Sequence, residues 1–183
     1  MAYLLEIAGS TLIGGMIIFI ILNLNSNVLR SSSSFSFSKI TQENLTSVVE
    51  EIEYDLKKIG YRSPDPVILS ADTNAITFRY DINNDGTPET IAYFTSDTTA
   101  LINTPNPRDI LLYRTVNGGS PQTSNIGVTR FRLWYYDALG NLTTTPADIR
   151  SIKFALNIES VYAFDEEYTV TYIERLIQPN NLR

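Results

Sequence analysis

The sequence predicts an α+β protein in which a long N-terminal helix is followed by an antiparallel β-sheet domain. Three observations lead to this prediction. Residues 7–29 carry no charged side chain and are numerous enough to cross the ~30 Å hydrocarbon layer of a membrane as a helix. Through residues 45–59, apolar side chains recur at steps of three and four, which is the spacing of an amphipathic helix. From Val67 onward the spacing changes to two, as in strands that bury one face.

The first segment, residues 1–30, is expected to be a hydrophobic helix for a membrane or a filament core. Its centre, residues 12–22, is apolar on every side, so no face of the helix suits water. A cleaved signal peptide fits less well, because residues 1–9 contain no Lys or Arg and no small-residue cleavage site follows the apolar run. Glu6 is the single charged residue before Arg30. Its carboxylate either complements the helix dipole at the interface or requires a partner in apolar surroundings.

The second segment, residues 31–62, combines a serine-rich stretch with an amphipathic continuation of the helix. Residues 31–38 read SSSSFSFS, and such poor helix formers predict a flexible or locally melted stretch. An apolar stripe follows, with charged residues on the opposite side of the helix. The stripe consists of Leu45, Val48, Val49, Ile52, Leu56 and Ile59. Gly60, with prolines at positions 64 and 66 shortly beyond it, predicts the end of the helix.

The third segment, residues 63–183, is expected to be an antiparallel β-rich globular domain. Alternating patterns and short apolar runs indicate about seven strands, bounded by turn clusters such as NNDG, NTPNP and NGGSPQ. The expected strands cover residues 67–69, 76–80, 90–94, 110–113, 131–135, 152–158 and 170–172. Strands at this spacing, without helices between them, favour an antiparallel assembly over a parallel βαβ fold.

The composition excludes several classes of function. The chain has no Cys, which excludes disulfides, thiolate zinc sites and cysteine nucleophiles. It also has no His, so the commonest general base is missing and a Ser-His-Asp hydrolase cannot be built. A net charge of −6 argues against nucleic acid as a partner of this chain. Since no nucleophile–base pair, phosphate loop or carboxylate dyad is recognisable, we expect no enzymatic activity.

Two parts of the helical region resemble proteins of the type IV pilin superfamily. Mature members open with a hydrophobic residue and carry Glu as their fifth residue, and residues 2–6 read A-Y-L-L-E once Met1 is discounted. The motifs T-Q-E-N-L at 41–45 and E-Y-D-L-K-K-I-G-Y-R at 53–62 resemble the end of the long helix in W-type minor pilins and in the J-type minor pseudopilins of type II secretion. On this resemblance we expect the mature chain to begin at Ala2.

The likeness continues through the β-rich region and covers nearly the whole chain. Residues 76–86 resemble the family hairpin "F-x-Y-D … D-G", and residues 112–119 resemble "L-Y-R … N-G-G". Residues 128–140 resemble "V-x-x-F-x-x-x-Y-x-D-x-x-G". The resemblance therefore rests on more than one motif.

The resemblance implies a structural minor pilin or pseudopilin subunit. Such a subunit is anchored in the inner membrane with its globular domain outside the cytoplasm, and then enters an extracellular filament as part of a tip or initiation complex. Its partners would be other pilin-like subunits and membrane lipid. As one helix, residues 2–59 would be about 87 Å long, which suits a filament spine. Ala2 and Glu6 would form the assembly site, because the family glutamate pairs with the N-terminal ammonium of a neighbouring subunit, offsetting the burial of both charges.

A turn in the β-rich domain has two interpretations. Asp81, Asn83 and Asp85 match D-x-[DN]-x-[DN]-G, the opening of an EF-hand-like calcium loop, and Glu89 follows shortly after the glycine. The bidentate Glu at the twelfth loop position is missing, since Ala92 stands there. The same residues are usual in a metal-free hairpin turn, which is the interpretation we favour from the sequence. No other cofactor is expected.

The alternative to a filament subunit is a membrane-anchored surface binding or adhesion module, with calcium as a stabilising ion. In that case the apolar helix would never leave the bilayer. Glu6 and the length of the helix favour the filament subunit, because a plain anchor requires neither.

Overall fold

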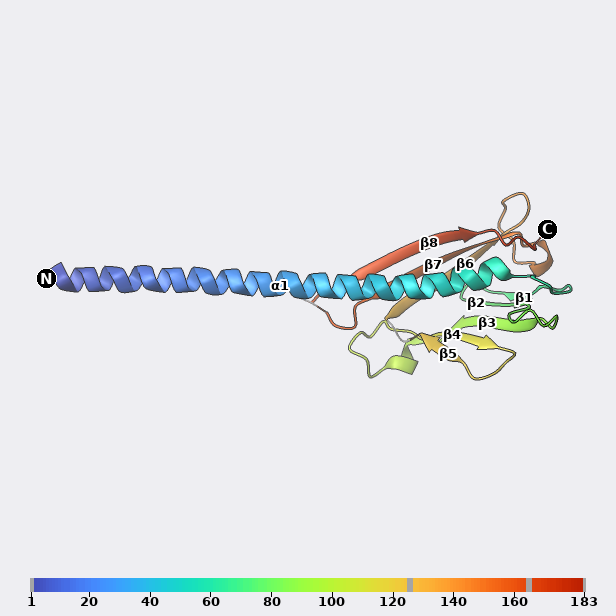
Figure 1. Cartoon of the computed structure of the whole chain (residues 1–183), viewed down its shortest axis with the longest axis horizontal. Helices are drawn as coiled ribbons and strands as arrows, with labels where there is room; N and C mark the ends of the chain where they lie inside the picture. Colours follow the sequence, from blue (N-terminus) through green and yellow to red (C-terminus); the bar gives the residue numbers. More distant parts are fainter. Residues whose placement is uncertain (1, 125–126, 164–165, 183) are drawn as a thin grey trace. The chain divides into compact units, whose positions relative to one another are not determined.

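The computed structural model describes residues 2–124, 127–163 and 166–182, and it confirms the predicted α+β fold (Figure 1). One helix precedes eight strands and two short 3-10 turns in the described residues. The elements are α1 (Ala2–Lys58), β1 (Ile68–Ala71), β2 (Ala75–Tyr80), β3 (Glu89–Thr95), η1 (Thr98–Leu101), β4 (Leu112–Val116), β5 (Gln122–Ser124), β6 (Val128–Tyr136), η2 (Pro146–Asp148), β7 (Ser151–Glu159) and β8 (Val170–Ile177).

The chain forms two compact units, Met1–Phe37 and Ser38–Arg183, whose boundary falls in the serine-rich stretch. This stretch, residues 31–38, is helical throughout, so the expectation of a melted segment is wrong. Extending an existing helix adds one hydrogen bond for each residue fixed, whereas nucleation is the costly step, and this outweighs the low propensity of serine. In addition, the Ser36 hydroxyl donates to the Ser32 carbonyl at 2.9 Å, which gives the side chain a partner within the helix.

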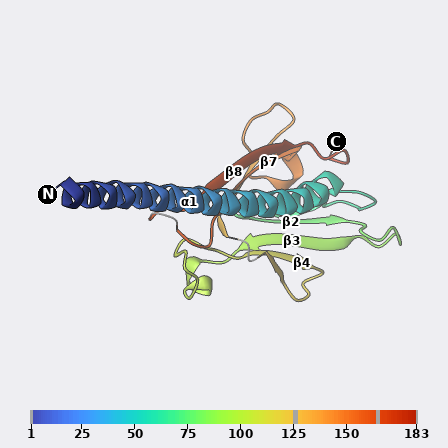
Figure 2. The ribbon, with the colours of Figure 1, turned by 60° about the vertical axis from the view of Figure 1, so that its left-hand side comes forward.

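The strands form two antiparallel sheets, each in sequence order. Strands β1 to β5 make a five-stranded sheet, and β6 to β8 make a three-stranded sheet. Figure 2 shows β2, β3 and β4 grouped apart from β7 and β8. The antiparallel assembly predicted from the short connections is therefore confirmed.

Individual strands differ from the sequence prediction at their ends. Strand β5 (Gln122–Ser124) was not predicted, because three polar residues show no alternation of their own. Strand β4 begins two residues later than expected, at Leu112, and β8 continues beyond residue 172 to Ile177. Pairing with β7 along its whole length explains the longer β8, since a neighbour stabilises residues that a periodic pattern alone does not identify.

The core of the second unit joins the end of α1 to both sheets. All six residues of the predicted apolar stripe are at most 6% exposed, which confirms the amphipathic assignment. They belong to one hydrophobic cluster with alternate residues of β2, such as Ile76 and Phe78, and of β7, such as Ile152 and Phe154. Burying these side chains contributes about 1.5–3 kcal/mol each relative to leaving them in water. The apolar face of α1 from Leu45 to Leu56 is therefore packed into the domain.

The helix ends where the sequence predicts it. Gly60 has a φ of +78°, a left-handed conformation that costs glycine little. Its amide donates to the Arg79 carbonyl at 2.9 Å, which holds the end of the helix against β2. A Cβ at this position would come within 3.1 Å of both Val67 and Asn181, so glycine also permits the close approach.

Candidate functional site

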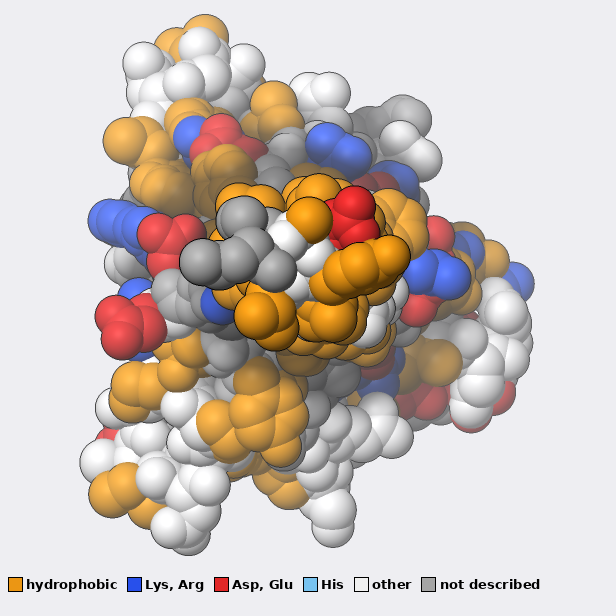
Figure 3. All heavy atoms as spheres, turned by 90° about the vertical axis from the view of Figure 1, so that its left-hand side faces the viewer, with side chains coloured by type: hydrophobic (Ala, Val, Ile, Leu, Met, Phe, Trp, Pro, Cys, Tyr) orange, Lys and Arg blue, Asp and Glu red, His pale blue; other side chains and the backbone are white. Residues whose placement is uncertain are grey.

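The first candidate site is the apolar part of α1 between Ala2 and Leu29. Every described large hydrophobic side chain in this part is more than half exposed, and Figure 3 shows hydrophobic groups around the helix. Within the described residues, α1 is the one helix that is long and apolar enough to cross a membrane. Such a surface is unfavourable in water and is suited to lipid or to other apolar helices.

The two residues predicted for assembly lie in the first turns of α1. Ala2 and Glu6 are four residues apart, so they occupy the same face of the helix, and both are exposed. Within the described residues, Glu6 makes no ion pair. The pairing of Glu6 with a neighbouring ammonium stays a prediction.

The second candidate site is the turn between β2 and β3, which brings together the four residues predicted for calcium. Asp81 directly follows β2, and its Oδ2 accepts a hydrogen bond from the Gly86 amide at 2.9 Å. Asn83 Oδ1 accepts from the Asp85 amide at 3.0 Å. Glu89, the first residue of β3, accepts from the Ile82 amide at 2.8 Å.

Charge in this turn is concentrated on three carboxylates, of which Asp81 is buried, Glu89 half-buried and Asp85 exposed. The side chain of Asp81 is 0% exposed, and its Oδ1 is buried without a hydrogen-bond partner. The Thr87 amide donates to Asp85 Oδ1 at 2.7 Å, and this bond lowers the pKa of the Asp85 carboxyl. Within the described residues, no three His, Cys, Asp or Glu side chains gather as a metal centre. Any cation here would therefore also require amide, carbonyl or water oxygens as ligands.

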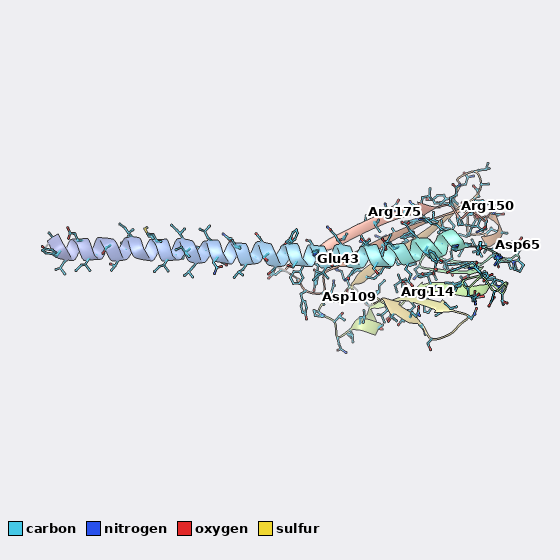
Figure 4. The ribbon with its side chains drawn as sticks, viewed as in Figure 1. Glu43, Asp65, Asp109, Arg114, Arg150 and Arg175 are labelled. Atoms are coloured by element: carbon cyan, nitrogen blue, oxygen red, sulfur yellow. The ribbon has the colours of Figure 1, made fainter. Side chains whose placement is uncertain are left out.

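A third group of polar residues was missed by the sequence analysis and positions α1 on the five-stranded sheet. Asp55 of α1 is 2% exposed. Its carboxylate accepts hydrogen bonds from the hydroxyls of Tyr80 at 2.5 Å and Tyr93 at 2.7 Å. Arg114 of β4, labelled in Figure 4, donates its Nε–H to the same carboxylate at 2.7 Å. We call these four residues the Asp55 cluster.

The charges and hydrogen bonds of the Asp55 cluster suit a structural role, in which Asp55 holds α1 on the five-stranded sheet. Burial is the main reason why the pKa values of Tyr80 and Tyr93 lie above the ordinary value of tyrosine, and the negative charge of Asp55 adds to the effect. Both tyrosines therefore remain hydrogen-bond donors at neutral pH. The sequence does carry a signal, because Asp55 lies three residues after Ile52 and four before Ile59, on the apolar stripe. A carboxylate on that stripe requires a buried partner.

A second buried polar group joins the β3–β4 connection to the end of β7. Asn106 Nδ2 donates to Glu159 Oε2 at 2.9 Å, and Arg108 Nη2 donates to the same oxygen at 2.7 Å. Asp109, on the same connection and labelled in Figure 4, is 3% exposed, and its Oδ1 has no hydrogen-bond partner. Burial raises the pKa of the Asp109 carboxyl, and the nearby charge of Glu159 acts in the same direction.

An open groove of about 740 Å³ lies along β1, opposite η2. Asp65 and Arg150, at the same end of the domain in Figure 4, are the charged residues in its lining. Arg150 Nη1 already donates to the carbonyls of Ala147 and Ile149, at 2.8 and 2.9 Å. The arginine therefore supports the backbone of the groove wall.

Comparison of the chain with family models, with curated proteins and with solved structures gives no match.

Proposed function

We propose that the chain is a structural subunit of a pilin-like filament, a minor pilin or pseudopilin of the tip or initiation complex. It is anchored in the inner membrane through the first half of α1, with the sheet domain outside the cytoplasm, and it joins an extracellular filament on assembly. The filament is of the type IV pilus or type II secretion kind. Other pilin-like subunits and membrane lipid are its partners, and we propose no catalytic role.

The single observation that carries this proposal is the division of α1 into two surfaces. From Ala2 to Leu29 the helix exposes apolar side chains and one carboxylate, whereas the stripe from Leu45 to Leu56 is buried in the sheet domain. The buried part attaches the domain to the helix, so a subunit packed through its apolar part would carry the domain with it. This is the requirement for a subunit whose helix packs in a filament core.

Glu6 distinguishes a filament subunit from a simple anchor. A carboxylate in an apolar layer is unfavourable, by about 2.5–3.5 kcal/mol at mid-bilayer, unless an opposite charge pairs with it. In a filament, the N-terminal ammonium of the next subunit would supply that charge. In a surface binding module that stays in the bilayer, Glu6 would have no such role, and lipid alone would cover the helix.

The test compares Glu6→Val with a charge-preserving control, Glu6→Asp, in the native host. We expect both variants to insert into the membrane and to fold their sheet domains. Glu6→Val should recover fewer pilin-like partners on co-purification, because a neighbour's ammonium would be left unpaired, whereas Glu6→Asp should recover more than Glu6→Val. Equal partner recovery in the two variants and the unchanged protein would instead favour the membrane-anchored binding module.

A further inference from the structure

The turn between β2 and β3 contains a carboxylate oxygen for which the protein supplies no donor. Asp81 Oδ1 is buried and has no hydrogen-bond partner, although a charged oxygen is costly to bury alone. The other oxygen of the same carboxylate, Oδ2, accepts from the Gly86 amide across the turn. The Asp81 carboxylate is therefore bonded to the turn through Oδ2, whereas Oδ1 receives no hydrogen bond. A metal-free hairpin explains the bond to Gly86 but not the second oxygen.

We propose that this turn binds one calcium ion through Asp81 Oδ1 and the side-chain oxygens of Asn83 and Asp85. These residues occupy the first, third and fifth positions of the loop, where calcium loops of this type place their side-chain ligands. Calcium accepts six to eight oxygens, including amide and backbone carbonyls and water, so three side chains are a sufficient protein framework. This site is independent of filament assembly and goes beyond the proposed function.

The backbone of the turn already has the form that such a site requires. Gly86, at the sixth position, has a φ of +88°, which allows the sharp turn in which its amide reaches the carboxylate of the first position. At the end of the loop, Glu89 Oε2 accepts a hydrogen bond from the Ile82 amide at 2.8 Å. Binding would therefore require little rearrangement of the backbone.

The charges near the turn favour a divalent cation. Asp81, Asp85 and Glu89 bring three negative charges, and Arg62 brings one positive charge at 3.8 Å from Asp81 Oδ2. Two negative charges therefore remain, which a calcium ion balances. Arg62 does not replace the ion. Its Nη1 donates to the Asn84 carbonyl at 3.3 Å, and the Asp81 oxygen nearest to it is Oδ2, which already accepts from the Gly86 amide.

The missing ligand at the twelfth position sets the expected affinity. Ala92 cannot supply the bidentate carboxylate that tightens EF-hand sites, so we expect a dissociation constant on the order of 10⁻⁴–10⁻³ M, as in extracellular calcium modules. Magnesium should bind more weakly, because it demands a rigid octahedral set and releases water reluctantly.

The experiment uses the full chain in an uncharged detergent after removal of metals with a chelator. Equilibrium dialysis against radioactive calcium measures stoichiometry, and the melting temperature of the sheet domain is followed as calcium increases. We expect one saturable site and a melting temperature that rises and then levels off. Asp85→Ala should weaken binding at least about tenfold and abolish the rise, since removal of one carboxylate ligand lowers both charge and coordination. Asp81→Asn should do the same.

Asp137→Ala is the matched control. Asp137 also closes a turn, where its Oδ1 accepts from the Leu139 and Asn141 amides at 2.8 Å, but its Oδ2 has a partner as well, Asn141 Nδ2 at 3.3 Å. This variant should bind calcium as the unchanged protein does. The proposal is overturned if the unchanged protein shows no saturable calcium binding up to 10 mM, if Asp85→Ala binds equally well, or if magnesium binds as tightly. Because Asp85 is exposed, loss of folding does not obscure the result.

Discussion

Replacing Asp55 by alanine is the most informative perturbation of the fold. The Asp55 carboxylate is the single acceptor shared by Tyr80, Tyr93 and Arg114, which come from three neighbouring strands of the five-stranded sheet. Asp55→Ala would leave the guanidinium of Arg114, whose side chain is 16% exposed, without its closest counter-charge. The variant would also remove the acceptor of two buried tyrosine hydroxyls.

The size of the effect follows from these contacts. Removing one partner of a buried ion pair costs about 3–5 kcal/mol. The lower part of that range, about 3–4 kcal/mol, applies here, because Glu51 remains 3.5 Å from Arg114 Nε and offers a second, half-exposed carboxylate. For a domain of this size, 1 kcal/mol corresponds to roughly 2–4 °C, so the melting temperature should fall by about 6–16 °C.

The assay is urea unfolding of the full chain in detergent, with near-ultraviolet circular dichroism as the probe of the sheet domain. Glu50→Ala is the matched control, because it removes an exposed carboxylate from the same helix and should change the unfolding free energy by less than about 0.5 kcal/mol. Asp55→Asn should fall between the two. If Asp55→Ala loses less than about 1 kcal/mol, the Asp55 cluster does not anchor α1 to the sheet, and the reasoning is refuted.

Two further predictions concern pH. Burial raises the pKa values of Tyr80, Tyr93 and Tyr135, so in the folded protein these three should stay protonated near pH 11, where exposed tyrosines are ionised. The stabilising effect of these protonated tyrosines is present below the unfolded pKa of about 10 and is lost as the pH rises. The absorbance of ionised tyrosine at 295 nm should therefore increase in two phases during a pH titration of the folded protein. Ionisation of all tyrosines in a single phase near pH 10 would contradict this prediction. Burial also raises the pKa of Asp109, whose ionisation consequently disfavours the folded state above the unfolded pKa of about 4. Asp109→Asn should therefore increase the unfolding free energy at pH 7 but not at pH 3.5, and an equal effect at both pH values would exclude an electrostatic cause.

Patterns that depend on near neighbours were readable from the sequence. The apolar stripe of α1, its end at Gly60 and most of the strands follow from periods of 3.6 and 2 and from turn residues, each of which acts within a few positions. The uncharged run of residues 7–29 likewise identified a helix able to cross a membrane, because the thickness of the hydrocarbon layer sets its length. The serine-rich stretch of residues 31–38 is helical against the prediction, because the helix on either side extends through residues of low propensity.

Which polar groups meet was decided by the tertiary structure alone. The partners of Asp55 lie 25, 38 and 59 positions along the chain, and Glu159 lies 53 positions from Asn106. No local pattern encodes such pairs, because strand order and register bring them together only when the sheets form. The sequence alone determined that Asp81 belongs to a calcium-type motif. Only the fold determined that its Oδ1 is buried without a donor, because burial depends on what the rest of the chain places around the turn.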